Sequence, residues 1–315
     1  MILPYPVPVK EIRNLPLTMS MVVLNVLIFV LIFSGGGSRL DNTAILNEES
    51  LSLTGRLYHQ YIHALPTEKQ KGLPGWIRKM DVQDAGQRQV LGAFALKDKS
   101  FLDQAETYSF RGDEVSISDW RKDLKDFRSL YFSQVLFQFG LSSVKSGPLA
   151  WLTYQFSHSG IVHLMSNLLF LVVMGAAVEL YFGSAALLLL YLAGGVAGGA
   201  GFLFMNPQGM VPMVGASASV SALLAFYALT EWRKRVRFLY FISPIQGQFG
   251  IIYLPTLLII PLFLLVDLAN ILSTPEGIGS GVAYSAHLGG TACGFLFAGM
   301  WRLKENLKNK SALPH

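Results

Sequence analysis

The sequence predicts an all-α, polytopic membrane protein: a bundle of six transmembrane helices with a large, mostly helical first extracytoplasmic loop. Three observations support this prediction. The composition is strongly apolar, six apolar runs approach the length that crosses a bilayer, and basic residues flank those runs on one predicted side. Together these features are typical of an integral membrane protein.

The composition limits the classes of protein to consider. The chain has 315 residues, of which 52% are hydrophobic and 14% are charged, and its mean hydropathy is +0.43. Soluble globular domains carry roughly 25% charged residues. These values exclude a disordered chain, a nucleic-acid-binding protein with a basic surface and an ordinary soluble enzyme. The single cysteine, Cys293, excludes a disulfide framework and a thiolate zinc site.

Six apolar runs are candidate membrane spans, because a helix that crosses the hydrocarbon layer needs roughly 20 apolar residues. The first run lacks a small-residue cleavage site, so we expect it to be retained and not cleaved as a signal peptide. The fourth run is short and rich in Ala and Ser. The runs cover residues 17–33, 162–182, 185–205, 217–232, 249–272 and 282–301.

The charged residues predict the topology. Residues 36–148 hold 15 Lys/Arg and 14 Asp/Glu, and the remaining basic residues fall in three clusters beside apolar runs. If the N-terminus is inside, six spans place all three clusters on the cytoplasmic face, as the positive-inside rule requires. The clusters are Lys10 and Arg13; Arg233, Lys234, Arg235 and Arg237; and Arg302, Lys304, Lys308 and Lys310.

The predicted organisation therefore has five parts. A cytoplasmic N-terminus (1–16) leads into the first transmembrane helix (17–34), and a large extracytoplasmic loop (36–148) follows it. Spans two to six form a core over residues 150–303, and a cytoplasmic tail (304–315) ends the chain.

The pattern of the large loop is mostly helical. Asn47 is placed to cap a helix that runs to about Leu65, before Pro66. A second helix is predicted over residues 119–139, after Ser118, because its apolar residues recur on one face. We expect that face to lie on the membrane surface or on the helical bundle.

Three groups of polar residues lie in or beside the predicted spans, where polar groups are costly and are therefore candidates for function. The first group is the segment 215–221, which opens the fourth span. Gly215 allows a tight turn, and the helix start after it supplies N–H groups that favour an oxyanion at Ser217. Ser217 and Ser221 also belong to a stripe of small residues, for which helix packing is the simpler explanation.

The second group is Ala286-His287 with Gly290 and Gly294, in the sixth span. His287 and the two glycines share one helical face. The glycines permit a close approach by the fourth span, and this contact would place His287 against Ser217. The alternative is a histidine that is hydrogen-bonded inside the bundle.

The third group is His158, His163 and Asn167, at the outer end of the second span. His163 and Asn167 are four residues apart and can both donate hydrogen bonds to an oxyanion. Polar capping near the membrane interface is the simpler explanation. A zinc site made of His158, His163 and His287 is a weak hypothesis, because no carboxylate lies near them in sequence. Together the three groups offer a nucleophile, a base and a pair of donors, as acyl transfer requires.

At these residues the chain resembles the rhomboid family of intramembrane serine proteases, over about residues 150–303. The motifs that carry the resemblance are HxxxN (His163, Asn167), GxS (Gly215, Ser217) and AHxxGxxxG (Ala286, His287, Gly290, Gly294). The resemblance implies a rhomboid-like six-helix bundle and a catalytic dyad, with Ser217 as nucleophile and His287 as general base. It also implies an oxyanion site built from His163, Asn167 and the backbone N–H of Ser217.

The resemblance further implies residues with structural or site-lining roles. Glu179 is expected to brace loops, and Gly183 to permit a turn. Ser221 stands where some members of the family have an aromatic residue that stacks on the histidine. The residues implied in these roles, apart from Gly183, are His158, Gly215, Ser221, Gly290, Gly294 and Glu179.

The residues and the resemblance together predict an intramembrane serine endopeptidase that hydrolyses peptide bonds in or near the transmembrane segments of membrane proteins. One alternative is a catalytically silent rhomboid-like protein that binds transmembrane clients. Another is a transporter of small solutes, for which Asp267 and Asn270 in the fifth span are the best support.

We expect no cofactor and no metal. The expected partners are transmembrane protein substrates and the lipid bilayer, and not nucleic acid. The expected location is the bacterial inner (plasma) membrane with both termini cytoplasmic, because no organelle presequence is visible. The residues do not specify the substrates, the oligomeric state, the role of residues 36–148 or the role of Asp267.

Overall fold

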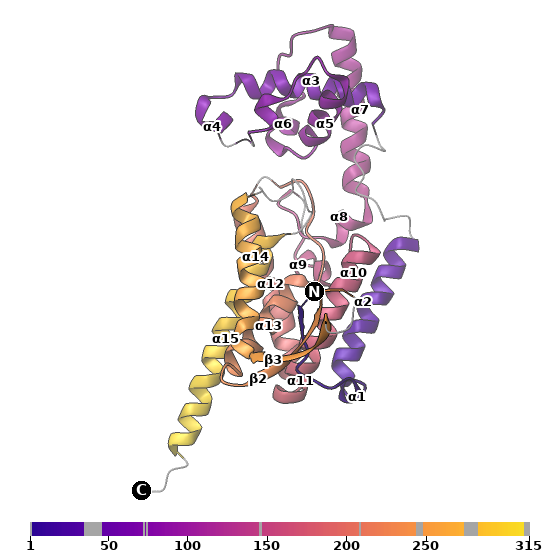
Figure 1. Ribbon diagram of the computed structural model, residues 1–315. Coiled ribbons are helices and arrows are strands. Elements are labelled where there is room, and N and C mark those ends of the chain that lie inside the picture. Colours follow the sequence, from indigo (N-terminus) through magenta and orange to yellow (C-terminus); the bar gives the residue numbers. More distant parts are fainter. Residues whose placement is uncertain are drawn as a thin grey trace.

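The structure is a computed structural model that describes residues 2–34, 46–71, 73, 75–144, 147–207, 209–243, 248–273 and 283–311. Over these residues the chain is mostly helical. A bundle of apolar helices carries a second group of helices at one end, and the last turns of the chain extend from the other end (Figure 1). The predicted boundary between the first span and the large loop lies outside the described residues.

Six helical segments form the bundle in the described part of the chain. They are α2 (Pro16–Ser34); α10 (Ile161–Phe170), η4 (Leu171–Gly175) and α11 (Ala176–Phe182), which form one continuous segment with a π-helical middle; α12 (Ser184–Met205); α13 (Ser217–Thr230); α14 (Ile259–Ser273), preceded by η5 (Thr256–Leu258); and α15 (Tyr284–Ser311). By length and composition, α2, the segment Ile161–Phe182 and α12 are able to cross a membrane. The chain is thus a polytopic helical membrane protein, as predicted.

The fifth predicted span is a helix over only part of its length. Residues Phe249–Pro255 form strand β3, which pairs antiparallel with β2 (Arg235–Phe241), and β1 (Ile2–Pro4) pairs with the other edge of β2. The prediction of a helix over 249–272 is therefore wrong for its first seven residues. These residues are rich in Ile and aromatic side chains, which favour strands, and hydropathy alone does not separate an apolar strand from an apolar helix.

The three basic clusters lie at one end of the bundle. Strand β1 brings the N-terminal segment beside β2, and the guanidinium of Arg237 lies 4.8 Å from the centre of the Tyr5 ring. From α15, the guanidinium of Arg302 lies 5.1 Å from the centre of the Trp232 ring, just after α13. Residues far apart in the chain therefore meet here, as the charge pattern predicts.

Glu179 joins three helices at the same end. Its carboxylate accepts hydrogen bonds from the backbone N–H groups of Leu17 (3.0 Å) and Thr18 (2.8 Å), and from the hydroxyls of Thr18 (2.7 Å) and Ser184 (2.8 Å). The first N–H groups of a helix have no partner inside the helix, and a negative charge there also meets the positive end of the helix dipole. Glu179, on α11, thus caps α2 and holds the start of α12.

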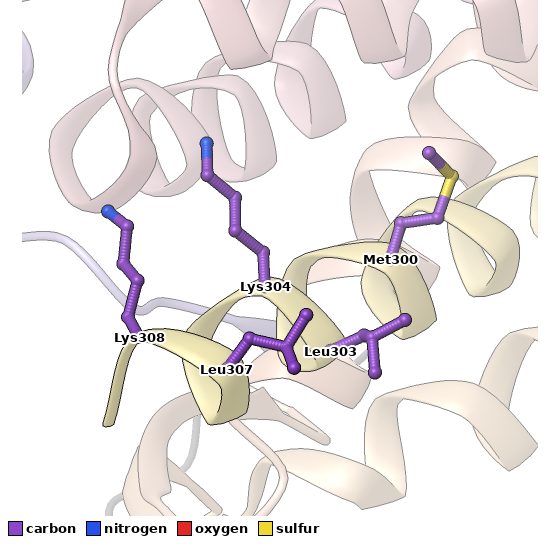
Figure 2. A pocket seen from close by; sticks show the side chains of 5 residues that line it. All are labelled: Met300, Leu303, Lys304, Leu307 and Lys308. Carbon is purple, nitrogen blue, oxygen red and sulfur yellow. The ribbon is translucent and has the colours of Figure 1, made fainter. Parts of the chain in front are cut away.

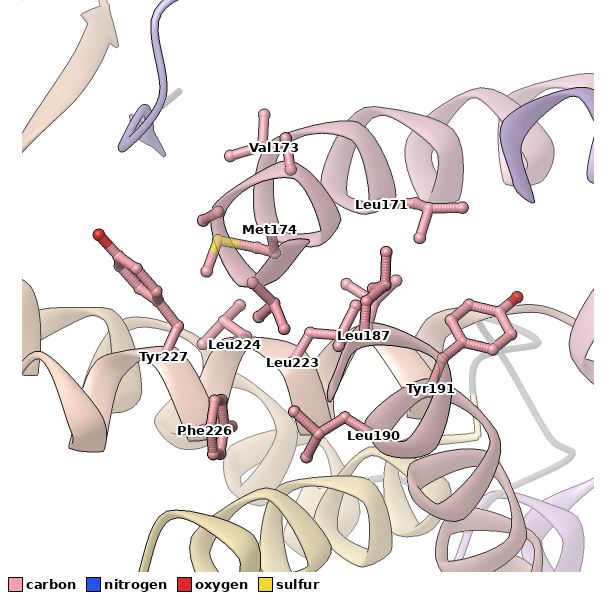
Figure 3. Packing of buried hydrophobic residues seen from close by; sticks show 14 of the residues in the cluster. Leu171, Val173, Met174, Leu187, Leu190, Tyr191, Leu223, Leu224, Phe226 and Tyr227 are labelled. Atoms are coloured by element: carbon pink, nitrogen blue, oxygen red, sulfur yellow. The ribbon is translucent and has the colours of Figure 1, made fainter. Parts of the chain in front are cut away.

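The bundle core lies between the π-helical turn and two further helices. Leu171 and Met174 of η4 pack with Leu187 and Leu190 of α12 and with Leu223 of α13 (Figure 3). All five side chains are buried. These apolar contacts hold α13 against the second and third spans.

The large loop contains its own group of helices, called the loop helices below. They are α3 (Glu48–Ala64), α4 (Thr67–Lys71), the short turn η2 (Ile77–Lys79), α5 (Ala85–Ala95), α6 (Lys99–Gln104), α7 (Glu114–Ser133) and α8 (Val135–Phe139). Asn47 caps α3 through a 2.7 Å hydrogen bond from the Ser50 N–H, which confirms the predicted start of that helix. The group has a separate apolar core, in which the Trp120 indole donates to the Thr54 hydroxyl (2.9 Å).

The second helix predicted in the loop starts earlier and packs elsewhere than expected. It is capped by Asp113 and therefore begins before residue 119, and it is interrupted at the extended residue Gln134. Leu124 and Phe127 on its apolar face are buried in the core of the loop helices. For the part of this helix before Gln134, the expectation that the face lies on the membrane or on the bundle is therefore wrong, because the other loop helices cover it.

The loop helices also contact the segment between α12 and α13. Met210 is buried in their core with 3% of its surface exposed, although it belongs to the segment that leads to Ser217. Leu141 and Met213 exchange two backbone hydrogen bonds, of 2.9 and 2.7 Å. Asp98, which caps α6, pairs with Gly209. The loop helices thus hold the segment before α13.

We predict that Glu179→Gln lowers the melting temperature of the protein in detergent. Hydrogen bonds to a charged group contribute about 1.5–3 kcal/mol each, and the neutral amide also turns an N–H₂ group toward the donors of α2. Glu68→Gln, on the exposed helix α4, is the matched control and should not change the melting temperature. Equal melting temperatures for all three proteins would contradict the capping role.

We predict that Met210→Ala reduces the hydrogen-exchange protection of the loop helices. Truncation of a buried Met costs roughly 2–5 kcal/mol, because the lost contacts leave a cavity. Met205→Ala is the matched control, since the Met205 side chain on α12 is 54% exposed. Unchanged protection of α3 and α7 in Met210→Ala would show that Met210 does not stabilise this core.

Candidate active site

Helix α13 begins at Ser217, inside the bundle. It has 14 residues and therefore rises roughly 21 Å, less than the ~30 Å thickness of the hydrocarbon layer. Its last turn adjoins the basic residues that follow Trp232. Its first turn, with Ser217, lies toward the opposite end of the bundle.

Gly215 turns the chain just before α13. Its φ is +120°, a conformation that residues with a side chain rarely adopt, and its N–H donates to the Tyr154 carbonyl (2.9 Å). A Cβ at Gly215 would lie 2.7 Å from Nε2 of His163 and 3.7 Å from Nδ2 of Asn167. Both of these side chains, on α10, therefore lie directly against the turn that precedes Ser217.

Helix α15 lies against α13 without intervening side chains. A Cβ at Gly290 would overlap the Ala218 carbonyl, and a Cβ at Gly294 would overlap the Ala222 carbonyl. These two contacts advance by one turn on both helices, so the helices run parallel and in step. One turn before Gly290, the same alignment places His287 at the level of the Gly215 turn.

The His287 ring is held on one side and unpartnered on the other. Its Nδ1 lies 2.9 Å from Oδ1 of Asp267, on α14, and the Tyr284 ring meets it edge-on at 6.0 Å between centres. Its Nε2 is buried and has no hydrogen-bond partner among the described residues, so the Ser217 hydroxyl does not reach it here.

The three serines of α13 differ in their surroundings. Ser217 is half-buried. Ser219 is fully buried and donates to Oε1 of Gln155 (3.1 Å), and Ser221 donates back to the Ser217 carbonyl (2.9 Å). Ser219 and Ser221 are therefore committed to internal hydrogen bonds.

The polar residues of α10 are ordered by short contacts. Nδ1 of His163 lies 3.1 Å from the Ser159 hydroxyl, which leaves Nε2 toward Gly215. The Asn167 amide donates to the His163 carbonyl (2.8 Å). His158 is fully buried at 5.2 Å from the His163 ring, and neither of its ring nitrogens has a partner within the described ranges. A hydroxyl, an imidazole and several donors thus gather at one helix end, a set suited to acyl transfer.

Comparison with known families agrees with this arrangement. The family model of the Rhomboid domain matches residues 145–303, about half of the chain. The chain belongs to the rhomboid family. The matched region contains α10 to α14, the part of α15 up to residue 303, and every residue gathered around Ser217.

Two curated relatives have names that refer to rhomboid proteins. The chain is 31% identical over 173 residues to RHOMBOID-like protein 12, mitochondrial, of Arabidopsis thaliana, covering 50% of this chain and 47% of that protein. It is 32% identical over 159 residues to Rhomboid-related protein 2 of Mus musculus, covering 48% and 46%. The chain thus spans about half the length of the curated relatives it matches.

Two residues implied by the rhomboid resemblance, Glu179 and Gly183, lie at the end of the bundle opposite the Ser217 turn. Glu179 lies roughly 24 Å along the helix from His163, at the end with the basic clusters, where it caps α2. Gly183 has a φ of +89° and joins α11 to α12. Both therefore serve the opposite end of the rhomboid bundle.

The zinc hypothesis receives no support from the geometry. In the described ranges, no group of three or more His, Cys, Asp or Glu side chains is placed to hold a metal ion.

A surface pocket lies on the last turns of α15, lined by Met300, Leu303, Lys304, Leu307 and Lys308 (Figure 2). It contains no hydroxyl, carboxylate or imidazole, and it lies several turns from His287.

Residue-by-residue reasoning missed two supports of the site. Gln155 links Ser219 to the turn before α10, and the Tyr154 carbonyl holds Gly215. Both lie in a segment that precedes the second span and carries no motif. The partner of Asp267 was also not predicted, although an acid in an apolar span is itself a signal.

We predict that Gly290→Ala destabilises the protein by about 1–3 kcal/mol, because the new methyl group overlaps the Ala218 carbonyl and forces α15 away from α13. Gly299→Ala on the same helix is the matched control, since a Cβ at Gly299 meets nothing within 4 Å. Thermal unfolding in detergent measures both. A Gly290→Ala protein as stable as the control would contradict the close helix contact.

Proposed function

We propose that this rhomboid-family chain is an intramembrane serine endopeptidase that cleaves peptide bonds in or near the transmembrane segments of membrane proteins. The observation that carries the proposal is the convergence at the start of α13, where His163 and Asn167 lie against the Gly215 turn and His287 lies at its level. Three separate helices supply these groups, which helix packing alone does not require.

In the proposed acylation step, Oγ of Ser217 attacks the carbonyl carbon of the substrate peptide bond and its proton passes to Nε2 of His287. Nε2 is suited to this role because it is buried and engaged by no other group in the described part of the chain. The carbonyl oxygen becomes an oxyanion. Donors for it are the Ser217 N–H at the helix start, the His163 ring and the Asn167 amide.

The tetrahedral species then collapses. The C–N bond breaks, and the imidazolium of His287 gives its proton to the departing amine nitrogen. A water molecule loses a proton to Nε2 and attacks the acyl ester, which releases the carboxylic acid product and restores the Ser217 hydroxyl. The imidazole therefore accepts and returns one proton in each half of the reaction.

Helix α13 is too short to cross the hydrocarbon layer and its last turn adjoins basic residues, so the proposal places Ser217 below the opposite membrane surface. This position defines the substrate class. A site below the membrane surface reaches peptide bonds of segments that are themselves in the membrane, and water must enter through a polar cavity. A helical substrate must unwind locally, because its peptide bonds are shielded and hydrogen-bonded. Glycine or proline near the cleaved bond lowers that cost.

We propose a bacterial inner-membrane location with both termini in the cytoplasm, and with Ser217 nearer the opposite face. The contacts of Tyr5 with Arg237 and of Trp232 with Arg302 support this orientation, since they gather the basic clusters at one end. Transmembrane protein substrates and the surrounding lipid are the proposed partners.

We predict that Ser217→Ala abolishes cleavage of a model single-span substrate in liposomes, because the variant lacks the proposed nucleophile directly after the Gly215 turn. A fluorophosphonate should label the wild type and Ser219→Ala but not Ser217→Ala. Equal cleavage by wild type and Ser217→Ala would overturn the proposed function. If neither protein cleaves the substrate but both retain it on purification, the chain is the silent client-binding alternative.

A further inference from the structure

Asp267 is a carboxylate in an apolar helix. It lies in the middle of α14, between Val266 and Leu268, whose side chains are 57% and 42% exposed on the outer surface of the bundle. Asp267 itself points inward and is 8% exposed. An acid at membrane depth is costly unless a partner compensates it, so its contact identifies its role.

The contact of Asp267 is the ring of His287. The atoms Oδ1 and Nδ1 are 2.9 Å apart, and the two side chains are 12% and 16% exposed. From the proposed function, we propose that Asp267 is a positioning residue for His287, so that the site is a Ser217-His287-Asp267 arrangement and not a dyad. The proposal adds a third member from a helix that none of the sequence motifs includes.

The hydrogen bond selects one form of the imidazole. A carboxylate only accepts, so Nδ1 carries the proton and donates it to Asp267. The other nitrogen, Nε2, then has a free lone pair, and it is the buried atom without a partner in the described ranges. This is the form of histidine that a serine hydroxyl requires of its base.

The carboxylate also matters when the proton moves. As the Ser217 proton reaches Nε2, the ring becomes a cation in a setting of low dielectric, where a nearby negative charge has a large effect. Asp267 keeps its own charge throughout and accepts the Nδ1–H in both states, so it takes no proton. The Tyr284 ring, which meets His287 edge-on, supplies no negative charge.

No other acid is placed for this role in the described bundle. Glu179 caps α2, Glu231 ends α13 and pairs with Lys234, and Glu305 lies in the last turns of α15. All three belong to the end with the basic clusters. Asp267 is therefore the one described carboxylate of the bundle within reach of the proposed base.

The test compares Asp267→Asn with wild type in liposomes. Asparagine keeps the size and packing but lacks the charge, and its N–H₂ group can donate to Nδ1 and so reverse the ring form. We expect kcat for a model transmembrane substrate to fall about 10²- to 10⁴-fold with little change in KM. Asn270→Ala, one turn further on α14, is the control and should retain wild-type kcat. Asp267→Glu should recover part of the activity.

A second readout does not depend on catalysis. In protein labelled with ¹⁵N-histidine, His287 should show a protonated Nδ1 in wild type, and this signal should be lost in Asp267→Asn, with assignment from His287→Gln. Melting temperatures establish whether each variant is folded, and Asp267→Ala, which also removes the carboxylate, replaces Asp267→Asn if the latter does not fold.

The outcomes separate the two proposals. If wild type cleaves its substrate and Asp267→Asn does so at the same rate, the positioning role is wrong and the protease survives. If wild type shows no Ser217-dependent cleavage, the proposed function fails, and the ¹⁵N spectra alone judge the contact. An unchanged Nδ1 signal in a folded Asp267→Asn protein would overturn the positioning role in either case.

Discussion

The backbone contact between α13 and α15 is the constraint on which the rest of the site depends. In a membrane, helices gain little from apolar burial against each other, because lipid is equally apolar, and close packing must hold them together. Gly290 and Gly294 allow this closeness, and Gly198 of α12 approaches Ala218 from a third side. Since the helices run parallel and in step, the contact sets the height of His287 relative to Ser217.

The contact explains why the motifs were informative. His287, Gly290 and Gly294 share one helical face through their spacing alone, so the residue types already predict which face meets a neighbour and at what level. The same argument holds for His163 and Asn167 on α10. Ser217 and the Gly215 turn were predictable for a different reason. A glycine just before a helix is a local sequence signal for a tight turn, and Gly215 does have a positive φ.

Other features depend on information that no local pattern contains. Strand β3 forms because β2 is available to pair with it, and an apolar run of seven residues fits a strand as well as a helix. Helix α7 begins at Glu114, before the predicted residue 119, and its added first turn buries Ile117 in the core of the loop helices, a contact that the local pattern does not contain. The partner of Asp267 depends on how α14 is rotated about its axis, which hydropathy does not determine.

The position of the segment before Ser217 also depends on residues that are far away in the sequence. The segment before Ser217 is held at Met210 by the loop helices, at Met213 by the backbone of Leu141 and at Gly215 by the Tyr154 carbonyl. Helix α13 itself is held along its length by α12 and α15. A shift of the loop helices against the bundle therefore acts first on residues 210–215. It would change the position of the turn, and with it the donors around Ser217, while the packed part of α13 stays in place.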